Sequence, residues 1–153
     1  MKKTKTIIIA VLIVLWLAVI WGHSFMSGED SSDESSFVTK LVTPVLELFV
    51  GKGNVTEHLV RKIAHFTEFF ILGALMTVFL NVRERRRFRY LGIALGACAL
   101  SAAIDETIQI FSANRGPSVA DALLDTCGAA AGILFLWAVI TACRKLSKTS
   151  SGV

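Results

Sequence analysis

Four long apolar stretches constrain this chain more than any other feature. The chain has 153 residues, of which 54% are hydrophobic and only 18% are charged, whereas a soluble domain has about 25% charged residues. A helix needs about 20 mostly apolar residues to cross a hydrocarbon core about 30 Å thick. The sequence therefore predicts an all-α protein, a four-helix transmembrane bundle in a single domain over residues 1–153. The expected helices cover about residues 6–25, 60–81, 90–111 and 119–143.

The first apolar stretch could also be a secretory signal peptide, because the basic segment "MKKTK" precedes it. Its apolar run is long for a signal peptide, however, and no small-x-small cleavage motif follows in "WGHSFMSG". We therefore expect an uncleaved membrane anchor.

The positions of lysine and arginine predict the orientation. Basic residues lie before the first stretch, in "NVRERRRFR" between the second and third stretches, and in "RKLSK" after the fourth. In a four-span protein these places share one side, which the positive-inside rule assigns to the cytoplasm. We expect both termini there and a loop over residues 27–58 outside. The net charge of +4 then reflects membrane orientation and contact with anionic lipids rather than a nucleic-acid partner.

The outer loop contains one further pattern. Apolar residues recur at near-helical spacing in "FVTKLVTPVLELFV", residues 37–50. This pattern predicts a short amphipathic helix on the outer surface. A lid over a site and simple surface packing are both open interpretations.

Ionisable side chains gather at the outer ends of three of the apolar stretches. At 3.6 residues per turn, Arg61, His65 and Glu68 share one helix face. A charge that faces lipid at mid-membrane costs roughly 2.5–3.5 kcal/mol, so we expect the set to face a common polar cleft at the outer-leaflet end. Its members are Arg61, Lys62, His65, Glu68, Asp105, Glu106, Gln109, Arg115, Asp121 and Asp125.

A purely structural interpretation of these charges also exists. Arg61 with Asp105, and His65 with Asp121, could be interhelical ion pairs that hold the bundle together. The number of acids exceeds what cohesion of four short helices needs, and an intramembrane ionisable residue indicates a functional site by default.

Two glycine pairs predict close helix approach. Gly92 with Gly96, and Gly128 with Gly132, have the G-x-x-x-G spacing that lets transmembrane backbones come together. We expect both pairs to contribute to a compact bundle around the cleft.

The segments "RKIAHFTEFFILG" and "DETIQIFSANRGPSVADALLDTCGAAAG" resemble the VanZ-like membrane proteins, over about residues 16–137. That family shows R-K-x-x-H-F-x-E, an acid-E-x-x-Q-x-F stretch, a following Arg, and D-x-x-x-N-x-x-G. Asp125 stands where the family usually has Asn, and Phe69 where Tyr is common. The resemblance implies a bacterial cell membrane protein of the cell envelope, associated with resistance to the glycopeptide teicoplanin. It does not supply a reaction.

Two functions follow for the cleft. In the first, it binds an anionic envelope lipid, a lipid-linked envelope precursor, or a glycopeptide or lipopeptide antibiotic, and modulates antibiotic resistance. Cationic side chains suit a phosphate in such a site. In the alternative, the protein is an intramembrane hydrolase or transferase acting on a lipid-linked phosphate or glycan. Ligand-binding residues would be Arg61, Lys62, Glu106, Gln109, Arg115 and Asp125, and catalytic ones His65, Glu68, Asp105 and Asp121.

A metal is not predicted from the sequence. The spacing of His65 and the carboxylates matches no recognised metal motif, unlike H-E-x-x-H. We therefore expect neither a metal nor a cofactor, although a divalent cation held by imidazole and carboxylate groups is an alternative.

Overall fold

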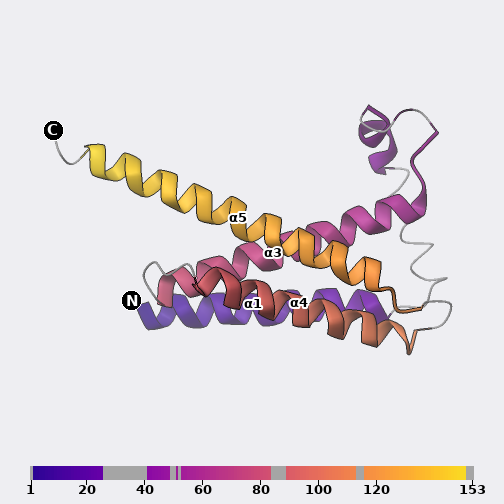
Figure 1. Cartoon of the computed structure of the whole chain (residues 1–153), viewed down its shortest axis with the longest axis horizontal. Coiled ribbons are helices and arrows are strands. Elements are labelled where there is room, and N and C mark those ends of the chain that lie inside the picture. Colours follow the sequence, from indigo (N-terminus) through magenta and orange to yellow (C-terminus); the bar gives the residue numbers. More distant parts are fainter. Residues whose placement is uncertain are drawn as a thin grey trace.

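The computed structural model describes residues 2–25, 41–48, 51, 53–83, 89–112 and 116–150. Within these ranges the chain is helical and has no β-strand, which confirms the predicted fold class. All four long helices are sufficiently long and apolar to cross a membrane. They are α1 (Lys2–Phe25), α3 (Glu57–Arg83), α4 (Arg89–Gln109) and α5 (Val119–Ser150) (Figure 1).

The bounds of all four helices differ from the predicted ones. Helix α1 begins four residues earlier, and α3 is longer at both ends. Helix α4 ends at Gln109 because the next amides bond three residues back, with Ser112 N donating to the Gln109 carbonyl at 3.1 Å, which tightens the chain out of the α-helix. Helix α5 has 32 residues and is therefore about 48 Å long. This exceeds a hydrocarbon core of about 30 Å, so α5 extends beyond the membrane region.

The polar side chains lie at the end of the bundle opposite the start of α1 and the end of α5. The four helices alternate in direction, so that the start of α1 and the end of α5 lie on the same side in Figure 1. The opposite end, where α3 and α5 begin and α1 and α4 end, holds the ionisable residues. We call it the polar end.

Glycines allow the backbones of α3 and α5 to cross in contact. A Cβ on Gly128 or Gly132 would overlap the carbonyl oxygens of Phe66 and Phe70, respectively, and a Cβ on Gly73 would overlap that of Ala129. We call Gly73, Gly128 and Gly132 the glycine crossing. The crossing makes α3 and α5 the most extensively packed helix pair.

The expectation for the other glycine pair was wrong. Side chains built at Gly92 and Gly96 would meet nothing within 4 Å among the described residues. Both glycines lie on an exposed face of α4, so their spacing reflects no helix contact in the described part of the chain.

A small apolar core joins the helices beside the crossing. Its buried members are Ile20, Phe69, Leu72, Cys98, Ala102 and Ala129. The outer face of α1 is apolar and exposed, for example at Ile7, Val11 and Leu15. An exposed apolar stripe of this kind suits contact with lipid.

The predicted surface helix is present in part. Residues 41–48 form a helix, whereas residues 37–40 and 49–50 lie outside the described part of the chain. Its apolar residues Leu41, Val45 and Leu48 are exposed, and no residue of this helix lines the cavity described below. The helix therefore gives no support to a lid.

Candidate functional site

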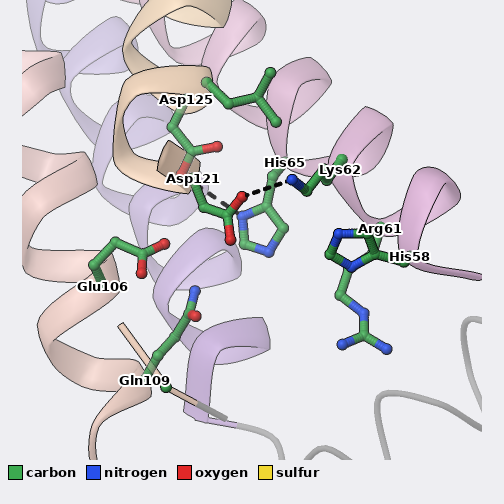
Figure 2. A pocket seen from close by; sticks show the side chains of 10 residues that line it. His58, Arg61, Lys62, His65, Glu106, Gln109, Asp121 and Asp125 are labelled. Atoms are coloured by element: carbon green, nitrogen blue, oxygen red, sulfur yellow. Dashed lines mark ion pairs between the residues drawn. The ribbon is translucent and has the colours of Figure 1, made fainter. Parts of the chain in front are cut away.

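A cavity of about 210 Å³ opens at the polar end, between α3, α4 and α5. Figure 2 shows the side chains of three helices around it, with Lys62 and His65 of α3 directed toward Asp121 and Asp125 of α5. The Arg61 guanidinium points away from these two carboxylates. The first turn of α3 supplies His58, which is exposed, and the loop before α5 supplies Gly116. The lining residues are His58, Arg61, Lys62, His65, Glu106, Gln109, Gly116, Asp121, Leu124 and Asp125.

The imidazole of His65 lies between two buried carboxylates. Its Nδ1 is 3.8 Å from Asp105 Oδ2 and 3.8 Å from Asp125 Oδ2. Asp105 is 0% exposed and Asp125 is 1% exposed. Two helices, α4 and α5, therefore each place a carboxylate beside the His65 nitrogen of α3. The distance of 3.8 Å from this nitrogen to either carboxylate is too long for a hydrogen bond.

Asp105 is held in place by hydrogen bonds. Ser24 Oγ of α1 donates to Asp105 Oδ1 at 2.7 Å, and Gln109 Nε2 donates to Asp105 Oδ2 at 3.2 Å. Ser112 Oγ in turn donates to the Ser24 carbonyl at 2.5 Å. Because all four residues are buried, this network fixes the end of α1 to α4 and orients the Asp105 carboxylate.

The start of α5 is fixed to α3 and α4. Ser118 Oγ accepts a hydrogen bond from Asp121 N at 3.3 Å, as an N-cap residue does. The Ser118 amide donates to Glu106 Oε2 of α4 at 2.6 Å, and Lys62 Nζ lies 3.2 Å from Asp121 Oδ1. The cap and these two contacts hold the first turn of α5 at the cavity wall.

Several buried polar atoms of the cavity have no hydrogen-bond partner among the described residues. They include Arg61 Nε, Glu106 Oε1 and both carboxylate oxygens of Asp125. A buried polar atom left without a partner typically costs about 1–3 kcal/mol. Such atoms indicate a site built to receive another group rather than one closed on itself.

The cavity gathers most of the residues that the sequence singled out. Arg61, Lys62, His65, Glu106, Gln109, Asp121 and Asp125 line it, and Asp105 borders it through His65. Glu68 is separate from the cavity lining: its Oε1 lies 2.8 Å from His23 Nδ1 of α1. Arg115 lies outside the described residues.

The ion pair that the sequence suggested between His65 and Asp121 is not formed, because each side chain has another partner. His65 approaches Asp105 and Asp125, whereas Asp121 pairs with Lys62. Helical phase correctly turned these side chains inward, but it does not fix the relative height of two helices. A shift of one turn, four residues along α5, exchanges Asp121 for Asp125.

Sequence reasoning missed three residues at the polar end, namely His23, Ser24 and His58. The first two lie at the end of α1, which the sequence presented only as an anchor. The signal was available, because "HS" closes the first apolar stretch at the same depth as the other polar groups. His58 lies one turn before Lys62 and two turns before His65, so its phase also points to the cavity.

Comparison with known proteins identifies the family. No curated protein and no solved structure matches the chain. The family model described as VanZ/LLP1 matches residues 9–141, which include all four long helices in whole or in large part and every residue of the cavity. The chain therefore belongs to the VanZ/LLP1 family of membrane proteins.

Proposed function

We propose that the cavity binds the anionic, phosphate-bearing headgroup of a cell-envelope lipid, and that this binding modulates resistance to glycopeptide antibiotics. The observation that carries the proposal is the pair of neighbouring cations, Arg61 and Lys62, both of which line the cavity at the polar end. The link to resistance rests on the resemblance to the VanZ-like proteins.

The size of the cavity favours a lipid headgroup over an antibiotic. Pockets that enclose drug-sized molecules have about 300–1,000 Å³, whereas this cavity has about 210 Å³. A phosphate with a small polar substituent fits that volume, but a glycopeptide does not. A lipid can also leave its acyl chains in the bilayer while only the headgroup enters.

Two features of the cations suit phosphate. Arginine offers a planar fork of donors to phosphate oxygens, and Arg61 Nε makes no hydrogen bond within the described chain. Lys62 is bound to Asp121, but these side chains are 40% and 35% exposed. Because a pair this exposed contributes at most about 1 kcal/mol, a phosphate can displace Asp121 from Lys62 at small cost.

Lipid binding by the purified protein tests the proposal. The full chain, reconstituted in phosphatidylcholine nanodiscs, should bind a fluorescent phosphatidylglycerol analogue more tightly than the matched phosphatidylcholine analogue. Arg61→Gln and Lys62→Gln should each weaken that binding about tenfold, the equivalent of about 1.4 kcal/mol. Lys5→Gln removes the same charge near the start of α1, about 28 Å along the helix from Ser24, and should leave binding unchanged. Equal binding by wild type and both cavity variants would refute the proposal.

The proposal also needs the polar end to face the outer leaflet. In a chain whose cysteines are replaced by alanine, Thr56→Cys at the polar end should react with a membrane-impermeant maleimide in whole cells. Ser147→Cys, near the end of α5, should react only after permeabilisation. The reverse pattern would place the cavity on the cytoplasmic side.

An intramembrane hydrolase or transferase is the second candidate, favoured by the position of His65 between Asp105 and Asp125. An imidazole beside carboxylates is an arrangement that can move protons. Release of phosphate or a free headgroup from a lipid-linked substrate, lost on His65→Gln, would favour catalysis. Headgroup binding without turnover would favour the binding function.

A further inference from the structure

The inner wall of the cavity has more carboxyl groups than neighbouring cations. Asp105 and Asp125 are both fully or almost fully buried, and the only described cation within ion-pair range of either is His65, if protonated. Lys62 is occupied at Asp121. A buried carboxylate is normally paired or bound to a metal, so this wall lacks a counter-charge.

Asp125 is the clearest example of a buried carboxyl group without a partner. Its side chain is 1% exposed, and neither oxygen has a hydrogen-bond partner among the described residues. Figure 2 shows its carboxylate on the cavity wall near His65. Buried polar groups are rarely left without partners, and this one lies beside two other potential metal ligands.

The separations of the three groups suit ligands of one ion. One ligand atom from each of His65, Asp105 and Asp125 lies within 4.8 Å of the others, and His65 Nδ1 is 3.8 Å from each carboxylate. Two ligands bonded at about 2.0–2.2 Å can lie up to about 4.2 Å apart. The two imidazole–carboxylate distances are within that limit, and the ligand atoms of the two carboxylates lie no more than 4.8 Å apart.

We propose that His65, Asp105 and Asp125 bind one divalent transition-metal cation, with Mn²⁺ and Zn²⁺ as the best fits. One imidazole and two carboxylates suit these ions, whereas Ca²⁺ takes six to eight oxygen ligands. The hydrogen bond from Ser24 to Asp105 is the kind of contact that orients a ligating carboxylate. This inference departs from the sequence-based expectation of no metal.

The ion would lie where a headgroup can reach it. His65 and Asp125 line the cavity, so positions left open by three protein ligands face that space. An anionic oxygen of the headgroup could then bind the ion while Arg61 and Lys62 hold the rest of the phosphate. That role rests on the proposed function, whereas the presence of the ion does not.

Metal titration without any anionic lipid tests the inference. The chelator-stripped full chain in phosphatidylcholine nanodiscs is titrated with Mn²⁺, and free Mn²⁺ is followed by electron paramagnetic resonance. We expect one saturable site per chain, with Zn²⁺ displacing Mn²⁺. The absence of a saturable site in the wild-type protein would overturn the inference, whatever any variant does.

A graded series locates the site. Asp125→Ala should weaken Mn²⁺ binding at least about a hundredfold, since loss even of groups that only orient a ligand typically costs 10–100-fold. Asp125→Asn keeps a neutral oxygen and should weaken binding less than alanine does. Glu57→Gln, an exposed acid at the same end, should bind as wild type. If Asp125→Ala binds as wild type, or Glu57→Gln loses the site, the assignment is wrong.

The same titration separates this inference from the proposed function. Saturable Mn²⁺ binding by a protein that does not bind phosphatidylglycerol would support the metal site and refute the proposed binding of a lipid headgroup. Phosphatidylglycerol binding by a protein with no Mn²⁺ site would do the reverse.

Discussion

The glycine crossing and the polar end are neighbours on the same two helices, yet they differ in almost every physical respect. At the crossing, Gly73, Gly128 and Gly132 bring α3 and α5 into backbone contact. One or two turns away, buried ionisable groups surround a cavity and leave several atoms without hydrogen bonds. Because the crossing already holds α3 to α5, the polar groups are not needed to hold these helices together.

The crossing should show the largest stability effect. Gly132→Ala places a Cβ against the Phe70 carbonyl, and backbone atoms cannot move aside as a side chain can. We expect the free energy of unfolding, measured by SDS titration in mixed micelles, to fall by about 3 kcal/mol or more. Gly96→Ala meets nothing within 4 Å and should not lower it. Equal behaviour of the two variants would remove the distinction between the glycine pairs.

The buried hydrogen bonds of the polar end should show an intermediate effect. Ser24→Ala leaves Asp105 Oδ1 without its donor, which should cost about 1–3 kcal/mol of unfolding free energy. Thr67→Ala is a suitable control, because Thr67 is exposed and its hydroxyl donates to the Ile63 carbonyl of its own helix. We expect a change within about 0.5 kcal/mol. A loss as large as that of Gly132→Ala would mean that the polar end is also a packing element.

The Lys62–Asp121 pair should show the smallest effect. Both side chains are more than one-third exposed, so a double-mutant cycle of Lys62→Gln and Asp121→Asn should give a coupling energy below about 1 kcal/mol. The coupling should shrink further at high salt. A coupling of several kcal/mol would show that this pair is part of the bundle's cohesion and is unavailable to a ligand.

The sequence predicted those parts of the fold that depend on the length of the apolar stretches, and not those that depend on local hydrogen bonds or on contacts between helices. Hydrophobic length alone located the four long helices, because the bilayer imposes it. It did not locate the end of α4, which depends on three local hydrogen bonds after Gln109. It also could not separate Gly128 and Gly132 from Gly92 and Gly96, since equal spacing does not reveal which helix face meets a neighbour.

The sequence predicted which residues line the candidate site better than it predicted which of their side chains contact each other. Helical phase turned Arg61, His65 and Asp125 toward a common interior, and all three line the cavity. The partner of His65 depends on the relative height of α3 and α5, which the glycine crossing sets and the sequence does not state. Ser24 was missed because the first apolar stretch was interpreted only as an anchor, although "HS" closes it at the depth of the other polar groups.

The most direct test of the central claim measures accumulation and resistance together for Arg61→Gln. In a bacterium without its own copy of the protein, membrane accumulation is quantified by immunoblot and teicoplanin tolerance by growth. Arg61 is half-buried, and its Nε makes no hydrogen bond among the described residues, so Arg61→Gln breaks no hydrogen bond of that atom. The account therefore predicts normal accumulation and loss of tolerance. A variant that accumulates normally and keeps full teicoplanin tolerance would contradict the claim that the polar end is a functional site.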